Sequence, residues 1–142
     1  MSRIMTRDEW RAFLAHGTRT GKLATVRADG RPHVVPIWFV VDGEDLAFTT
    51  GGGSVKARTM RRDPRVCLCV DDERPPFAFA MVEGTASLSE DPAELLRIAT
   101  AVGARYMGTE RAEEFGRRNG GPGELLVRVT PSNVFALDDI TG

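Results

Sequence analysis

One stretch of the sequence combines the residue types that bind anions. It reads TTGGGSVKARTMRRDPR, from Thr49 to Arg65, with a run of glycines ahead of a serine, a lysine and several arginines. The glycines, Gly51 to Gly53, can adopt backbone angles that other residues avoid, and they let a ligand approach the amides closely. Ser54 favours a helix start, where free N–H groups and the positive end of the helix dipole bind phosphate-like anions. Lys56 would add a point charge in the first helical turn, so the stretch predicts a phosphate-binding cradle.

The arginines that follow do not all belong to this cradle. At ~100° per residue, Lys56 and Arg58 lie about 160° apart around a helix, whereas Arg58 and Arg62 share a face. We expect the arginine face to lie near a longer anionic tail, a partner subunit or solvent. The alternative interpretation is a flexible loop, a capped helix and a solvated basic face. The stretch is neither a Walker loop nor a dinucleotide fingerprint, because its glycine and lysine spacing differs from both.

Length and composition limit the classes of protein that are possible. The chain has 142 residues, enough for one domain with its own core, and we interpret residues 1–142 as a single domain. Its formal net charge is −1, which gives no bulk attraction to nucleic acid or anionic lipid. The sequence has no membrane-length apolar run, and no apolar leader segment precedes its first charges, which predicts a cytoplasmic protein. Cys67 and Cys69 are too few for a disulfide framework and lack the further ligands that a zinc site needs. We therefore interpret them as buried thiols on one face of a strand.

The elements that must position the cradle follow from hydrophobic periodicity, caps and turns. Helices are predicted at Thr6–His16, from Ser54 to near Asp63, from an N-cap at Asp91 to about Tyr106, and at Thr109–Arg118. Strands are predicted at Lys22–Arg27, His33–Val41, Leu46–Thr50, Val66–Val70, Phe77–Ser89, Leu125–Val129 and Val134–Leu137. Together they predict a mainly β protein with flanking helices (α+β), built as a small barrel of six to seven antiparallel strands.

The predicted strand from His33 to Val41, HVVPIWFVV, is apolar at nearly every position, so both of its faces need cover. One face can fill the barrel. A ligand ring, a second subunit, both of these, or a helix of the same chain must cover the other face. Pro36 donates no backbone hydrogen bond and therefore marks an edge or an interruption of the strand ladder.

The order of three segments resembles a known family. LATVRADGRPHVVPIWFVVDG is followed by LAFTTGGGSVKARTMRRDPRVCLCVDD and then by a strand that ends in VEGTA. From about Gly21 to Ala86 this order is similar to the pyridoxamine 5'-phosphate oxidase-like split-barrel flavoproteins. TTGGGSVKA is similar to their flavin/deazaflavin oxidoreductase branch, which uses coenzyme F420. The resemblance implies a split β-barrel, a homodimer with cofactor sites at its interface, and hydride transfer between reduced deazaflavin and a small unsaturated organic acceptor.

The resemblance also implies which residues bind the cofactor. The ring would lie along the second strand, the phosphate at the glycine loop and helix start, and a strand of the partner would close the site. The implied residues are His33, Val34, Val35, Pro36 and Ile37 for the ring, Thr50, Gly51, Gly52, Ser54, Lys56 and Ala57 for the phosphate, Arg58 for the acidic tail, and Ala78, Phe79, Ala80 and Met81 from the partner.

Other functions stay open at this point. The same fold could use flavin mononucleotide (FMN) in place of F420, or could bind a flavin or haem-like ligand without catalysis. Nucleic-acid binding is disfavoured, because the arginine stretch lacks interleaved aromatic residues and the net charge is negative. The cofactor would carry the chemistry, so no side-chain nucleophile and no metal site is predicted. Of the two histidines, His33 is the better candidate proton donor because it adjoins the proposed ring strand.

Overall fold

The computed structural model describes residues 2–142. Its elements, in chain order, are α1 (Arg7–Ala15), β1 (Gly21–Val26), β2 (Pro32–Ile37), β3 (Val40–Asp42), β4 (Asp45–Gly51), α2 (Val55–Arg62), β5 (Arg65–Asp71), β6 (Phe79–Ser89), α3 (Pro92–Met107), η1 (Thr109–Arg111), α4 (Ala112–Asn119) and β7 (Glu124–Leu137). The predicted α+β class and strand number are confirmed. No helix within residues 2–142 is both long and apolar enough to cross a membrane.

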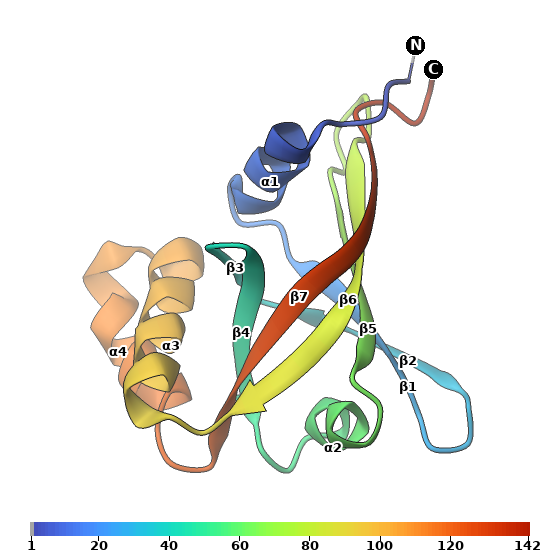
Figure 1. The fold of residues 1–142 in the computed structure, drawn as a ribbon. Helices are drawn as coiled ribbons and strands as arrows, with labels where there is room; N and C mark the ends of the chain where they lie inside the picture. Colours follow the sequence, from blue (N-terminus) through green and yellow to red (C-terminus); the bar gives the residue numbers. More distant parts are fainter. Residues whose placement is uncertain (1) are drawn as a thin grey trace.

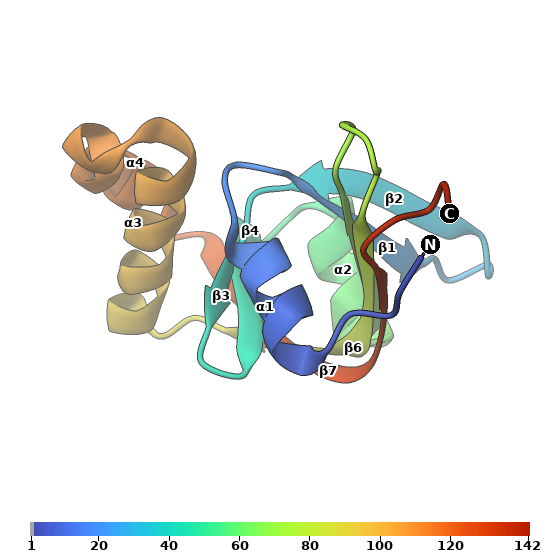
Figure 2. The same ribbon diagram turned by 90° about the horizontal axis from the view of Figure 1, so that it is seen from above.

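The strands form one antiparallel sheet of seven, in the order β2-β1-β5-β6-β7-β4-β3. The sheet curls around a core of large buried side chains that include Phe39, Phe48 and Leu68. α1 lies at one end of this barrel and α2 at the other (Figure 1). α3 and α4 stand together outside the barrel, where α3 packs against β4 and the start of β7 (Figure 2).

The two edge strands of the sheet are consecutive in the sequence. Residues 33–41, predicted as one strand, are divided between β2 and β3 at opposite edges, with Trp38 and Phe39 between them. The single-strand prediction is therefore wrong, because the chain turns inward at Phe39, which is 0% exposed in the core. Within residues 2–142 no ladder joins β2 to β3, so the barrel is split there. Pro36 lies on an edge strand, as predicted.

The outer face of β2 lacks cover from a helix of the same chain. Its side chains alternate, with Val35 packed against the core and Val34 on the outer face, 64% exposed. A helix of the same chain therefore does not cover Val34. Cover by a ligand ring or by a second subunit stays a prediction.

Local sequence signals explain where the helices begin. Thr6 and Glu9 form the predicted capping box of α1, and the Ser54 hydroxyl caps α2 as predicted. Asp91 is the N-cap residue of α3 and Pro92 its first residue, as predicted, but the Asp91 side chain makes no capping hydrogen bond. Pro92 has no N–H that would need an acceptor at this position.

Two further predictions need correction. Residues 124–137, predicted as two strands, form the single strand β7, which pairs with β6. The register shifts between Glu83 and Gly84, where Ser132 is the extra residue on β7. Cys67 and Cys69 share one face of β5, as predicted, but that face is the outer one and both thiols are half-buried rather than buried. Burial still raises the pKa of both thiols, which favours the protonated form.

Asp42 ties the β3–β4 hairpin to α3. Its carboxylate accepts hydrogen bonds from Arg97 at 3.0 and 3.1 Å and from Arg128 at 2.8 Å, and these bonds lower the pKa of Asp42 to about 2. The unfolded chain has the higher pKa, about 3.9. The stabilisation is therefore fully present above about pH 4 and is lost as the pH falls through about 2.

Asp42→Asn is expected to lower the free energy of unfolding by about 1–2 kcal/mol at pH 7, after allowance for solvent screening of a part-exposed group. The difference between variant and wild type should shrink strongly by pH 2. Urea denaturation at both pH values measures it. An equal difference at the two pH values would show that the carboxylate charge is not the source.

Candidate functional site

A cavity of about 360 Å³ lies at the split between the two sheet edges. It is lined by Pro36, Ile37 and Trp38 at the end of β2, Thr49, Thr50 and Gly51 at the end of β4, Lys56 of α2, Val102 of α3, Asn119 of α4 and Glu124 of β7. The fold therefore brings the predicted ring strand and the predicted phosphate loop to one cavity. Such a volume lies within the range of small-molecule sites.

The structure gives a different reason for the glycines of this loop from the one that we predicted. Gly51 to Gly53 all lie outside the positive-φ region, so unusual backbone angles do not explain them. Gly52 is needed for space, because a Cβ there would lie 3.1 Å from the carbonyl oxygen of Gly123. Its N–H donates to that oxygen at 2.8 Å, and Arg61 donates to the Gly52 carbonyl at 3.0 Å. These bonds hold the loop to Gly123, just before β7, and to Arg61 of α2.

The start of α2 offers unused donors. The Ser54 hydroxyl accepts from the Ala57 N–H at 3.1 Å and is hydrogen-bonded to the buried Thr50 hydroxyl, also at 3.1 Å. Within residues 2–142, the N–H groups of Val55 and Lys56 have no backbone acceptor. The half-buried Lys56 ammonium lines the cavity and pairs with no described carboxylate. A cation, free N–H groups and the positive helix end together fit a phosphate.

The arginine face of α2 is only partly free. Arg58 is exposed and does not line the cavity, which agrees with its predicted position away from Lys56. Arg62 is exposed to solvent, as predicted, and it also donates a hydrogen bond to the Val26 carbonyl of β1. Its guanidinium therefore helps to hold α2 against the sheet.

The residues of the predicted ring strand separate into two sets. Pro36 and Ile37 line the cavity, whereas His33, Val34 and Val35 do not. His33 lies opposite Thr25 in the β1–β2 ladder, and both His33 Nδ1 and Thr25 Oγ1 are buried without a hydrogen-bond partner in the described part of the chain. His33 does not line this cavity, and its role as a proton donor stays a prediction.

The residues predicted to come from the partner's strand lie on different faces of β6. Ala80 is 0% exposed in the barrel core, so its side chain cannot reach another copy of the protein. Ala78 precedes β6 and is half-buried, and Phe79 and Met81 lie on the outer face of β6. There the Phe79 ring packs against Phe135 with a centroid distance of 5.9 Å.

The structure adds lining residues that the sequence did not indicate. Trp38, Val102, Asn119 and Glu124 come from the crossover between β2 and β3, from α3, from the end of α4 and from the start of β7. Val102 follows an ordinary apolar helix pattern, and Glu124 resembles any polar residue after a turn. Only the pairing of Glu124 with Gly51 in the β4–β7 ladder brings it to the glycine loop.

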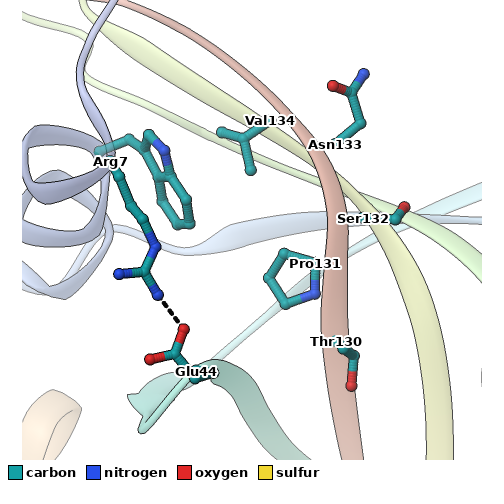
Figure 3. A pocket seen from close by; sticks show the side chains of 8 residues that line it. Arg7, Glu44, Thr130, Pro131, Ser132, Asn133 and Val134 are labelled. Atoms are coloured by element: carbon teal, nitrogen blue, oxygen red, sulfur yellow. Dashed lines mark hydrogen bonds and ion pairs between the residues drawn. The ribbon is translucent and has the colours of Figure 1, made fainter.

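A second hollow, of about 530 Å³, lies between α1, the β3–β4 turn and the middle of β7 (Figure 3). Arg7 extends toward Glu44 there, and the two side chains form an ion pair (Figure 3). The hydroxyls of Thr130 and Ser132 are bonded to neighbouring strands. Because its charges are already paired, this hollow is a weaker candidate than the cavity at Lys56. Residues 2–142 contain no cluster of His, Cys, Asp and Glu that could hold a metal ion.

Known proteins with related sequences and structures agree with this architecture. The family model of pyridoxamine 5'-phosphate oxidase matches residues 6–138. A 5a,11a-dehydrotetracycline/5a,11a-dehydrooxytetracycline reductase from Streptomyces rimosus subsp. rimosus is 41% identical over 56 residues, which span 37% of this chain and 39% of that protein.

Among solved structures, the conserved hypothetical protein Rv2991 from Mycobacterium tuberculosis has a TM-score of 0.83 at 29% identity, covering 94% of this chain and 85% of that one. An F420 reductase has a TM-score of 0.64 at 28% identity, covering 87% of this chain and 94% of that one. Since the family model spans nearly the whole chain and the split antiparallel barrel agrees with it, this protein belongs to the pyridoxamine 5'-phosphate oxidase family.

Proposed function

We propose that the protein is an F420-dependent oxidoreductase that acts on a small unsaturated organic acceptor. The observation that carries the proposal is the half-buried, unpaired Lys56 beside the free N–H groups of α2, in a cavity that Ile37 and Trp38 line on another side. The family includes oxidoreductases with flavin-type cofactors, and two of the similar proteins are an F420 reductase and a tetracycline-type reductase.

In this proposal the start of α2 holds the phosphate of the cofactor. Lys56 and the N–H groups of Val55 and Lys56 bind it, and the hydrogen-bonded pair of Ser54 and Thr50 keeps the helix start in place. Pro36 and Ile37 form the edge along which the ring lies. When bound, the cofactor supplies the hydride chemistry, and the chain contributes position, charge and exclusion of water.

Absorbance titrations of the purified protein with oxidised F420 and, separately, with FMN test the cofactor. We expect saturable spectral changes with F420 and a Kd at least tenfold lower than that of FMN. A preference for FMN would instead make the protein an FMN-dependent member of the same family. Binding of neither would overturn the proposed function as a whole.

We also propose that the protein is a homodimer, formed through the outer face of β2, β1, β5, β6 and β7. Apolar or weakly polar side chains occupy much of this face, namely Val34, Ala24, Cys67, Cys69, Phe79, Met81 and Phe135. The Lys22–Asp71 ion pair and Glu83 lie among them on the same face. Val34 is 64% and Phe135 41% exposed in the single chain. A sheet face of this kind is usually covered, and a second copy would bring Phe79 and Met81 toward the split of its partner.

Light scattering at micromolar concentration is expected to give twice the chain mass of 15.5 kDa. Val34→Glu places a charge in the proposed interface and should shift the protein to monomer. Leu96→Glu is the matched control, because Leu96 is 44% exposed on α3, outside the barrel, and should leave the dimer intact. A wild-type monomer, or an equal response of the two variants, would contradict this interface.

A further inference from the structure

We infer that Lys22 and Glu83 pair reciprocally between two copies of the chain, and that these two ion pairs set the register of the homodimer. The inference rests on the proposed homodimer and goes beyond it, because an apolar sheet face alone does not fix how the second copy is placed. Lys22 lies on β1 and Glu83 on β6, both on the outer face of the sheet. A carboxylate without a partner on a face that a second copy would cover is the observation that carries the inference.

The strand registers place the two charges on opposite sides of β5, the middle strand of the proposed interface. Lys22 lies opposite Cys69 of β5, and Glu83 lies opposite Cys67. The charges are therefore separated by one strand on each side and by two residues along the strand direction. The line that joins them crosses the centre of the face, between the two cysteines.

Glu83 needs a cation once this face is covered. It is exposed in the single chain, and its carboxylate forms no ion pair within residues 2–142. Covering an unpaired carboxylate is costly, because nothing offsets the loss of its hydration. On β1, β5 and β6 the cations of the outer face are Lys22 and Arg65, and Arg65 already bonds to Asp63 at 2.7 and 3.0 Å. Lys22 is therefore the cation that is left for Glu83.

Lys22 has a donor to spare for a second carboxylate. Its ammonium donates to the Asp71 carboxylate at 2.7 Å and to the Thr20 carbonyl at 3.3 Å. A lysine ammonium has three donors, so one remains. The side chains of Lys22 and Asp71 are 41% and 43% exposed, which leaves the ammonium accessible from the outer face.

A twofold axis makes the pairing reciprocal, since each contact in such a dimer is returned by the partner. An axis that lies between the two sheets, perpendicular to the line from Lys22 to Glu83 and above its midpoint, places Lys22 of each copy over Glu83 of the partner subunit. Packed sheets lie about 10 Å apart, a gap that a lysine and a glutamate can bridge together. The short side chains of Cys67 and Cys69 then lie between the two ion pairs.

Charge reversal tests the pairing. Lys22→Glu and Glu83→Lys each place two like-charged contacts in the homodimer, and each should raise its dissociation constant at least about 100-fold. An equimolar mixture of the two variants should form a heterodimer, with a dissociation constant within about tenfold of wild type, because both contacts then join a glutamate to a lysine. The double variant Lys22→Glu/Glu83→Lys should dimerise with itself for the same reason. Light scattering measures dissociation, and native mass spectrometry with one variant isotope-labelled identifies the heterodimer.

The matched controls carry the same reversals on α4, outside the proposed interface. Arg117→Glu and Glu113→Lys lie on exposed side chains, change the net charge by equal amounts and should leave the dissociation constant within about twofold of wild type. Circular dichroism establishes that each variant is folded.

Two results would overturn the pairing and leave the proposed homodimer standing. One is that the single variants stay dimeric, and the other is that the mixture and the double variant stay monomeric. A monomeric wild-type protein would overturn the homodimer and the pairing together, and the titrations with F420 and FMN would still decide the proposed catalytic function.

Discussion

Replacing Lys56 with alanine is expected to weaken F420 binding by about 1.5–3 kcal/mol, or roughly 10- to 150-fold, the range for a hydrogen bond to a charged group. Lys56 is the cation of the cavity lining and has no protein partner within residues 2–142 that could compensate or be left unpaired. For the same reason the cofactor-free variant should keep its stability to within about 0.5 kcal/mol, because alanine is a good helix former. Isothermal titration and thermal unfolding measure the two quantities.

The matched control is Arg58→Ala, two residues further along α2, exposed and outside the cavity lining. It should weaken F420 binding only slightly, through the acidic tail, and leave FMN binding unchanged, whereas Lys56→Ala weakens both. Arg62 would be a poor control, since its bond to the Val26 carbonyl makes it part of the packing of α2. Equal losses for Lys56→Ala and Arg58→Ala would mean that the helix acts as a diffuse cationic surface and that the cradle is wrong.

Arg105→Met is expected to destabilise the protein by about 2–4 kcal/mol, because it leaves several carbonyl groups without their charged donor. The Arg105 guanidinium donates to the carbonyls of Phe39 at 2.6 Å, Leu14 at 2.7 Å and Gly17 at 2.9 Å. It also lies over the Phe39 ring at 4.7 Å. Burial lowers the pKa of Arg105, yet an arginine stays charged at neutral pH. One side chain of α3 thus joins the end of α1 to the crossover beside the cavity.

Chemical denaturation and thermal unfolding measure this effect, with a fall in Tm of roughly 6–15 °C expected. Arg118→Met is the matched control. Arg118 also lies over an aromatic ring, that of Phe115 at 5.8 Å, but it is exposed and bonds to no carbonyl in the described part of the chain. It should change stability by no more than about 0.5 kcal/mol. A loss of similar size in both variants would assign the effect to ring contacts, and not to the carbonyl bonds.

Local signals in the sequence predicted most of the fold. Thr6 with Glu9, and Ser54 ahead of α2, are capping patterns whose physics is confined to a few neighbouring residues, and the structure confirms them. The prediction failed where distant contacts decide. The apolar run from His33 to Val41 is uniform in sequence, and only the burial of Phe39 and its bonds to α3 divide it between two sheet edges.

The candidate site could likewise be predicted only where its residues are close together in the sequence. The glycine loop and Lys56 are contiguous in the chain, so their association with a helix start could be predicted from the sequence. Trp38, Asn119 and Glu124 reach the cavity from three separate segments. Asn119, at the end of α4, is placed there by the crossing of α4 over α3. That crossing depends on Gly116, where a Cβ would lie 2.1 Å from the Thr100 hydroxyl oxygen, a contact with no local signature.

The split in the barrel bears on how the cavity can change during evolution. Between β2 and β3 the sheet is closed by the covalent chain at Trp38 and Phe39, and no ladder hydrogen bond crosses the gap within residues 2–142. Widening the cavity there breaks no strand ladder, whereas widening any other part of the barrel breaks paired N–H and C=O groups of the sheet. The backbone of Phe39 must keep its bonds to Tyr106 and Arg105, so the Trp38 side chain is the part of the crossover whose replacement can reshape the cavity with the barrel intact, and new ligand preferences should arise there first.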